Sequence, residues 1–495
     1  MLMSMSTIFF ILTAVVCGIF MLISWKVGGK ANESFSQYAI GGASFGMLLI
    51  FFTQFASIMG VSNFFAHAGN AYEQGLGILA FILGEQGSKI VFALIFVGII
   101  GKFTYNTLAE LIDDLIVRDK LTRAMAGILA SIIMISCVGS QGKAFGDLFQ
   151  VFTGTNPTPI VILFSAIFII YTVTGGVYSV IWTDLFQGVM CVVVGAIFYI
   201  FTFSQVDFSL AVLQERLAAV GKAELMTFAN LDVMSAINKF ITGLIGVLCF
   251  QSYWQRCFGS KSAKTAKRSM LWSGVICLFI VTLTAFAGLV VMTYNQGLDA
   301  NSAMPWFMMN CMPPVLCASI FVLVLCAGMS TADSTLNSAA ILIVNDVIHP
   351  FRPKQTDRQM VKQAKLVTLI IGVVSCLCGI YAQTILSLLS KAYTIAGVGL
   401  APLICIGMFW KERKGEHEMG KSNSKVTPWG ARSGIVVGVV VSQLPFFAGY
   451  SAIAGCVASA VTIIVVSLLT KNVPIEPMFA SEGDVRPLAK PDANN

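Results

Sequence analysis

The sequence predicts an all-α membrane protein with about thirteen transmembrane helices. Of the 495 residues, 57% are hydrophobic and only 11% are charged, whereas soluble domains carry about 25% charged residues. A soluble chain of this composition could not cover its surface with polar side chains. The apolar residues are also grouped into runs of roughly 20, the length of a helix that crosses a bilayer. Both observations place the chain in a membrane.

The predicted spans follow one another through most of the chain. They cover residues 6–25, 44–70, 76–101, 124–150, 158–173, 177–202, 234–255, 269–293, 313–346, 361–382, 385–410, 431–448 and 450–470. The first span has no basic residue before it and no small-residue cleavage site after it, so we expect a retained helix rather than a signal peptide. We therefore expect one polytopic membrane domain at 1–470 and a short cytoplasmic tail at 471–495.

The positions of Lys and Arg predict which helix ends face the cytoplasm. If the N-terminus lies outside, 25 of the 31 Lys and Arg fall in inside segments, Arg256 among them, and only Arg216 and Lys222 fall in outside loops. The remaining four lie within spans: Lys89, Lys143, Lys239 and Lys391. Basic residues gather in cytoplasmic loops. We expect a plasma (inner) membrane protein with its N-terminus outside and its C-terminus in the cytoplasm.

This topology also accounts for the net charge of +7. No basic patch is interleaved with aromatic residues, so we expect no nucleic acid partner. The sequence has no nucleophile motif, phosphate-binding loop or zinc-protease pattern, and its linkers are too short for a catalytic domain. We therefore expect that the protein is not an enzyme.

The span at 44–70 carries polar residues halfway through the bilayer. Its stretch TQFASIMGVSNFF places Gln54, Ser57, Ser62 and Asn63 around Gly60. A break in a membrane helix leaves backbone groups unpaired, and such breaks are tolerated where they line a cavity and form ion or substrate sites. The alternative is that Gly60 only allows close helix packing.

The span at 234–255 shows a matching pattern, with Gly243 and Gly246 near its centre. The two interrupted spans are five apart, as expected if residues of about 44–202 and 234–410 form inverted repeats. Two interruptions in matching places favour broken helices over simple packing.

A third polar stretch, LCAGMSTADSTLNSA, lies within an apolar span. Ala327, Ser330, Thr331 and Ser334 are spaced at i, i+3, i+4 and i+7 and therefore share one helix face. Two hydroxyls one turn beyond a backbone carbonyl form a hard, neutral oxygen surface, which suits a small hard cation such as Na+. The alternative is that the hydroxyls bond to their own i−4 carbonyls.

Two carboxylates lie within spans. Asp333 adjoins the polar face, and a buried carboxylate needs a cation, a proton or a donor. Asp184, in TVTGGVYSVIWTDLFQG, lies about seven residues, roughly 10 Å, from the cytoplasmic end of its span. It could be a helix-entry residue at the interface. Because Gly175 and Gly176 already mark the turn, we favour a deeper position.

Four stretches resemble the sodium:solute symporter family. GGVYSVIWTDLFQ is similar to the family signature, with Ser179 in place of the usual Ala, and AGMSTADSTLNS is similar to its Ala-x-x-Ser-Ser/Thr segment. FQSYWQRCFGSKSAKTAKRS resembles its Gln-Arg cytoplasmic loop, and AGNAYEQGLG matches the end of the first broken span. The resemblance implies a LeuT-type fold of two five-helix inverted repeats, with one extra helix before and two after. It also implies coupling of Na+ entry to uptake of a small organic solute.

The resemblance also implies ion sites. The positions that match the family's main Na+ site are Ala56, Met59, Ala327, Ser330 and Thr331. Some members, such as the sialic acid transporters, have a second Na+ site, and its matching positions are Asp184, Ser330, Asp333 and Ser334. Asp333 departs from the pattern, which has a hydroxyl there, so this carboxylate could strengthen the site or carry a proton.

Solute groups are expected near the broken helices and their neighbours, at Ser57, Ser62, Asn63, His67, Glu85, Gln86, Gln141, Asn238 and Lys239. Sugar-transporting members carry a Glu-Gln pair where Ser62 and Asn63 stand, and proline-transporting members carry an Asp where Ile58 stands, so neither substrate carries over. Lys239 either pairs with a substrate carboxylate or snorkels outward, and we favour snorkelling. We expect a small polar or anionic solute.

Three alternatives stay open. A proton-coupled symporter on the same fold would use Asp184 or Asp333 as its proton carrier. A membrane sensor would need a soluble output domain, and we expect none after Leu469. A membrane enzyme would need a catalytic constellation. The expected partners are a small organic solute, Na+ and the lipid bilayer, with no obligate protein partner.

The charge pattern makes a prediction about topology. Reporter fusions at Lys264 and Lys421 are expected to report a cytoplasmic location, and a fusion near Lys222 an outside location, because basic loops stay on the cytoplasmic side. Paired phosphatase and fluorescent-protein fusions measure both sides. An outside signal at Lys264 would contradict the helix order.

Overall fold

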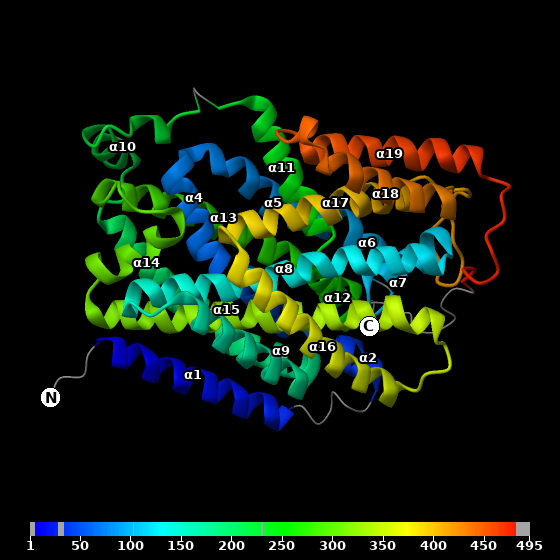
Figure 1. Ribbon diagram of the computed structural model, residues 1–495, viewed down its shortest axis with the longest axis horizontal. Helices are drawn as coiled ribbons and strands as arrows, with labels where there is room; N and C mark the ends of the chain where they lie inside the picture. The colour runs from blue at the N-terminus through cyan, green and yellow to red at the C-terminus, as the bar shows by residue number, and fades with distance from the viewer. Residues whose placement is uncertain (1–4, 28–33, 102, 229–230, 482–495) are drawn as a thin grey trace.

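The computed structural model describes residues 5–27, 34–101, 103–228 and 231–481. This part of the chain is helical, with isolated bridges and no strand. Most of the helices run along the long axis of the molecule, as Figure 1 shows. The predicted all-α class is therefore confirmed.

The helices of the first half are α1 (Met5–Val27), α2 (Phe35–Ile40), α3 (Met47–Ile58), α4 (His67–Gln74), α5 (Leu79–Val91), α6 (Val97–Ile100), α7 (Leu108–Ile112), α8 (Lys120–Thr153) and α9 (Pro157–Ser204). Short 3-10 or π segments extend or join them: η2 (Gly41–Ala43), η3 (Ser62–Ala66), η4 (Gly75–Ile78), η5 (Phe92–Phe96) and η6 (Asp113–Val117).

The helices of the second half are α10 (Leu210–Ala219), α11 (Val233–Leu248), α12 (Gln251–Gly259), α13 (Ala263–Tyr294), α14 (Ala300–Cys311), α15 (Pro314–Leu342), α16 (Asp357–Tyr381), α17 (Ile385–Phe409), α18 (Pro428–Gln443) and α19 (Ser451–Leu469). Their short segments are η7 (Ala223–Met226), η8 (Ile343–Ile348), η9 (His349–Phe351) and η10 (Pro445–Phe447).

Many of these helices can cross a membrane. Over the described ranges, 10 helices are long and apolar enough to do so, and Met47–Ile58 and Pro157–Val173 are shorter apolar helices. Helix covers the middle of every predicted span. The polytopic membrane class follows, while the count of thirteen crossings stays a prediction.

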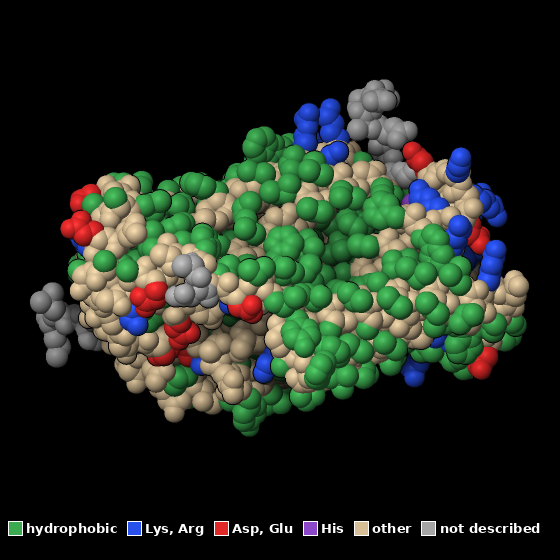
Figure 2. Space-filling model, turned by 90° about the horizontal axis from the view of Figure 1, so that it is seen from above, with side chains coloured by type: hydrophobic (Ala, Val, Ile, Leu, Met, Phe, Trp, Pro, Cys, Tyr) green, Lys and Arg blue, Asp and Glu red, His purple; other side chains and the backbone are tan. Residues whose placement is uncertain are grey.

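Lys and Arg gather at one end of the bundle, which we call the basic end. Three connections meet there: 103–119, 352–356 and 410–427. Most of the Lys and Arg visible in Figure 2 lie in the half of the molecule that contains this end, on the right of the view. The helices α10 and α14 lie at the opposite end (Figure 1).

The described part of the C-terminal tail packs on the basic end. The Lys120 amide donates to the Phe479 carbonyl at 2.9 Å, and the Ser481 hydroxyl donates to the Asp113 carboxylate at 2.8 Å. Burial raises the pKa of Asp113, and the nearby Arg123 guanidinium opposes this rise. The described part of the tail is therefore held against the basic end by hydrogen bonds.

The first predicted break is present at Gly60. The helix α3 ends at Ile58, and the chain resumes as helix only after Gly60. The Gln141 side-chain oxygen accepts the freed Val61 amide at 2.9 Å, which satisfies a donor that the break leaves without a helical partner. A Cβ at Gly60 would lie 2.4 Å from the Thr331 hydroxyl oxygen. Glycine is therefore needed here for close approach to α15.

The second break lies later than predicted. The helix α11 continues to Leu248, and α12 begins at Gln251, so Gly243 and Gly246 lie within a continuous helix. A Cβ at Gly243 would lie 2.5 Å from the Glu85 amide, and one at Gly246 would lie 2.1 Å from the Tyr393 ring. These two glycines permit close packing, and their prediction as the break itself was wrong.

A kink in α9 separates two predicted spans. Gly176 has φ 51° and ψ −156° inside this helix, a conformation that glycine adopts at little cost. Asp184 follows eight residues later, about 12 Å along the helix, and its side chain is fully buried. Asp184 is therefore enclosed by protein, as the preferred deeper position requires.

The contact at Gly60 makes a prediction about stability. Gly60→Ala is expected to lower the thermal unfolding temperature of the purified protein by several degrees, because the methyl group overlaps the Thr331 hydroxyl and overpacking costs about 1–3 kcal/mol. Gly87→Ala is the control, since a Cβ there meets nothing within 4 Å and alanine favours helix. Equal unfolding temperatures for the two variants would contradict the close approach.

Candidate functional site

The Thr331 hydroxyl lies at the break in α3. Its oxygen is 3.1 Å from the Ser57 carbonyl and 3.0 Å from the Ala327 carbonyl. The i−4 bond to Ala327 is the alternative considered for this face, and here the same hydroxyl also reaches another helix. Ala56 and Met59, the predicted carbonyl ligands, are buried beside this contact. The structure thus brings backbone oxygens of α3 and an α15 hydroxyl together in a buried place.

Ser330, one residue earlier, bonds in another direction. Its hydroxyl donates to one carboxylate oxygen of Asp184, and the Thr53 hydroxyl donates to the other. All three side chains are fully buried. Asp184 therefore lies beside the α15 polar face, as its match to the second Na+ site of the family predicts.

Arg256 is buried beside Asp184, which the sequence did not predict. Its Nη2 donates to the hydroxyls of Ser57 at 2.6 Å and Ser334 at 2.7 Å, and lies 3.4 Å from Asp184. Its Nε donates to Thr53 at 3.1 Å. Arg256 is therefore a buried helical residue of α12 rather than a loop residue. A guanidinium has several donors in fixed geometry, so this one side chain joins α12 to α3, α9 and α15.

Asp333 differs from Asp184 in its bonding. Neither of its carboxylate oxygens makes a hydrogen bond of good geometry within the described chain, and its side chain is fully buried. The Tyr171 side chain and the Ser334 backbone are polar groups near it. With both carboxylates ionised, Asp184, Asp333 and Arg256 carry a net charge of −1. The group can therefore accept one more cation or a proton.

A second charged network surrounds Glu85 on α5. One carboxylate oxygen lies 3.1 Å from His67 Nε2 and accepts the Gln86 amide at 2.8 Å, and the other accepts the Tyr393 hydroxyl at 3.3 Å. Lys89 Nζ donates to the Gln86 side-chain oxygen at 2.5 Å. His67, Glu85 and Lys89 are all buried, so this network lies within the bundle.

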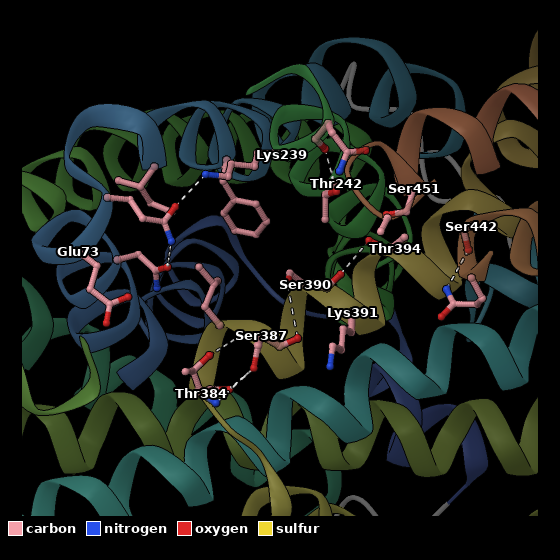
Figure 3. Close-up of a pocket in the computed structure, with 18 of the residues that line it drawn as sticks. Glu73, Lys239, Thr242, Thr384, Ser387, Ser390, Lys391, Thr394, Ser442 and Ser451 are labelled. Carbon is pink, nitrogen blue, oxygen red and sulfur yellow. Dashed lines mark hydrogen bonds between the residues drawn. The ribbon is translucent and has the colours of Figure 1, made fainter. Parts of the chain in front are cut away.

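A cavity of about 680 Å³ opens beyond this network, and we call it the vestibule. Its lining includes the ends of α4 and α18 and the starts of α11, α17 and α19, with Glu73, Phe81, Lys239, Lys391 and Thr394 among its residues. Figure 3 shows Lys239 on α11 and Lys391 on α17 at its wall. Arg256 lines a much smaller void, of about 10 Å³. The larger opening therefore faces away from the basic end.

The nine predicted solute-binding residues fall in separate places. His67, Glu85 and Gln86 form the charged network, while Asn238 and Lys239 line the vestibule. Lys239 Nζ donates to the Gln74 side chain at 2.8 Å there, on the wall of the vestibule.

The other predicted residues lie at the α3 break. Gln141 bonds to the broken backbone, Ser57 faces Arg256, and Asn63 is buried after the break. The Ser62 side chain lies outside the described residues.

Sequence reasoning missed four functional candidates. Lys89 was visible as an ionisable residue within a span, which alone marks a candidate site. Arg256 was hidden by its neighbourhood of basic residues. Phe81 and Tyr393, which stack with ring centroids 6.4 Å apart, carry no signal that distinguishes them from core aromatics.

Comparison with known proteins decides the family. The model of the Sodium:solute symporter family matches residues 38–416. The chain belongs to the sodium:solute symporter family. It is 25% identical over 366 residues to the high-affinity proline transporter PutP of Bacillus subtilis, covering 71% of this chain and 74% of that protein. It is 23% identical over 378 residues to the sodium/sialic acid symporter SiaT of Proteus mirabilis, covering 73% and 75%.

A solved structure supports the fold. The substrate-bound outward-open state of a Na+-coupled sialic acid symporter aligns with a TM-score of 0.77 and 20% identity, covering 93% of this chain and 98% of that one. The LeuT-type fold implied by the resemblance is confirmed. The symporter is a multi-pass membrane transporter, not an enzyme, and its family couples solute transport to Na+.

The Arg256 network predicts strong energetic coupling. Arg256→Gln is expected to destabilise the symporter by about 3–5 kcal/mol, because it leaves the Asp184 charge buried without its partner. The double variant with Asp184→Asn should recover part of this loss. Chemical unfolding in detergent measures both. Lys421→Gln, in an exposed ion pair with Glu418, is the control and should cost about 0–1 kcal/mol. Additive losses in the double variant would contradict a direct interaction.

Proposed function

We propose that this symporter imports a small polar or anionic organic solute with Na+ by alternating access. It would lie in the plasma membrane with its N-terminus outside and its C-terminus in the cytoplasm. The observation that carries the proposal is the Thr331 hydroxyl at the α3 break, 3.1 Å from the Ser57 carbonyl. A dehydrated Na+ needs several oxygens at one buried point, and this contact gathers them from two distant segments.

The main Na+ site would use the carbonyls of Ala56, Met59 and Ala327 and the hydroxyls of Ser330 and Thr331. The ion would replace hydrogen bonds that these hydroxyls now make within the protein. Since α3 belongs to the proposed repeat at about 44–202 and α15 to the one at 234–410, an ion bound to both would tie the repeats together.

Release of this ion inside would free the repeats to move. The vestibule opens away from the basic end, which agrees with an outward-facing state if the basic end is cytoplasmic. An ion that crosses the full membrane potential gains about 2.3 kcal/mol per 100 mV. Coupling would therefore draw on both the Na+ gradient and the potential.

A second cation site would involve Asp184, Asp333 and Ser334. Asp184 already has donors from Ser330, Thr53 and Arg256, while Asp333 has free oxygens. The second cation would therefore bind mainly to the Asp333 carboxylate.

A proton-coupled symporter is the second candidate function. The burial of Asp333 close to the Asp184 carboxylate supports it, because protonation removes one of two neighbouring buried charges. Solute uptake that persists in Na+-free buffer at low pH would select it.

The main site makes a prediction about Na+ affinity. Thr331→Ala should raise the Na+ concentration for half-maximal thermal stabilisation of the purified protein several-fold, since one oxygen ligand is lost. Thr331→Ser keeps the oxygen and should have a small effect. Solute affinity should fall in parallel with Na+ affinity because linkage is reciprocal. Superimposable Na+ titrations for the Ala and Ser variants would refute this site.

The second site makes a separate prediction. Asp184→Asn should leave a folded protein with weaker Na+ dependence or fewer ions bound, whereas Asp333→Asn should remove any dependence of Na+ affinity on pH. Na+ titrations at acidic and alkaline pH measure both. An unchanged Na+ response in both variants would assign these carboxylates a purely structural role.

A further inference from the structure

Lys89 is a buried cation that lacks a carboxylate partner within the described part of the chain. Its exposed fraction is 2%, and none of the ion pairs found there includes it. Its ammonium donates to the Gln86 side-chain oxygen and lies 5.5 Å from the centroid of the Tyr253 ring. An ammonium has three N–H donors. The Gln86 oxygen and the Tyr253 ring are both neutral partners, so the Lys89 ammonium can still bind an anion.

Glu85 does not serve as a direct counter-ion for Lys89. Its oxygens already accept from His67, Gln86 and Tyr393. Gln86 stands between the two charges, donating to Glu85 and accepting from Lys89. The two residues lie one helical turn apart on α5, about 6 Å along the axis, so their charges interact electrostatically without forming a direct ion pair.

His67 presents a second unused polar atom. Its Nε2 faces a carboxylate, which only accepts, so the proton of a neutral ring lies on Nε2. Its Nδ1 is then an acceptor, and it is buried without a hydrogen-bond partner in the described residues. His67 is only 1% exposed. A buried acceptor of this kind costs free energy unless a ligand donor or water pairs with it.

An aromatic pair lies beside the His67 ring. The Phe81 ring stacks on Tyr393 and lies 6.0 Å from the His67 ring, centroid to centroid. Phe81 also lines the vestibule. Phe81 is therefore in contact with both the vestibule and His67 of the charged network.

The vestibule itself favours anions. Its lining holds two lysines, Lys239 and Lys391, against one carboxylate, Glu73. The loops at this end carry Asp and Glu as well as Arg216 and Lys222, so the two lysines of the lining are a local feature of the opening. Each offers an entering anion a positive side chain.

We infer that the solute is a small organic acid whose carboxylate binds Lys89 and whose hydroxyl or amino group donates to His67 Nδ1. This inference rests on the proposed function and names its substrate class. A carboxylate pairs the buried ammonium, whereas a neutral solute would leave it unpaired in a dry site. A site built around such a charge rejects uncharged analogues strongly, because its own polar groups are then left without partners.

Matched probes test the two contacts separately. The probes are lactate, lactamide, propionate and propionamide, which differ independently in the charged carboxylate and in the hydroxyl group. Homologues with longer carbon chains are tested in the same way. Binding is measured with the full chain in nanodiscs, in NaCl and in choline chloride. Carboxylates should bind at least tenfold more tightly than their amides, and hydroxy acids more tightly than plain acids, in both cases with higher affinity in NaCl.

Two variants assign these preferences to residues. Lys89→Met should abolish the carboxylate preference, and Lys89→Arg should keep part of it. His67→Gln, which can still donate to Glu85, should remove only the preference for hydroxy acids. Lys391→Met is the control at the vestibule and should slow binding without changing the ratio of carboxylate to amide.

Stability provides a measurement that does not depend on the ligand. Lys89→Met should leave the unfolding temperature unchanged or higher, because a buried unpaired charge is replaced by an apolar side chain. A fall of many degrees would make Lys89 a structural partner of Glu85 and overturn the inference.

The outcomes also separate the inference from the proposed function. Tight, Na+-dependent binding of an amide that Lys89→Met leaves intact would overturn the inference and leave Na+ coupling standing. Carboxylate binding at Lys89 with no response to Na+ would support the inference and contradict Na+ coupling.

Discussion

The approach of Thr331 to the broken backbone at Gly60 is the constraint on which the rest of the structure depends. Only a residue without a side chain fits there, since a Cβ would lie 2.4 Å from the hydroxyl oxygen. Gln141 satisfies the amide that the break leaves free. The carbonyls on the other side of the break remain close to α15. A membrane helix can be interrupted in this way only where other groups replace its lost hydrogen bonds.

Two buried charged networks accompany this contact. In the first, Arg256 and Asp184 join α12, α9, α3 and α15. The second joins Glu85, His67 and Lys89 through Gln86, and its His67 ring lies beside Phe81, which lines the vestibule. Ser57 links the first network to the proposed Na+ site, because its hydroxyl accepts from Arg256 and its carbonyl accepts from Thr331.

Much of this arrangement follows from the sequence because its causes are local. The break at Gly60, the turn before Asp184 and the polar face of α15 each arise from residues near one another in the chain. The buried position of Arg256 could not be predicted, because neighbouring lysines make it resemble a loop residue and its partners come from three distant helices. The break predicted at Gly243 and Gly246 was wrong for a related reason. Glycine permits close packing, here against Glu85 and Tyr393, as readily as it permits a helix break, so the residue type alone does not distinguish the two.

The measurement that tests the central claim most directly is a pair of high-resolution cryo-electron microscopy maps, recorded in NaCl and in choline chloride. The account predicts a density in NaCl within coordination distance of the Thr331 hydroxyl, the Ala327 carbonyl and the carbonyls of Ala56 and Met59. That density should disappear in choline chloride, with α3 and α15 moving apart at Gly60. Identical maps with no ion density at this point would contradict the account.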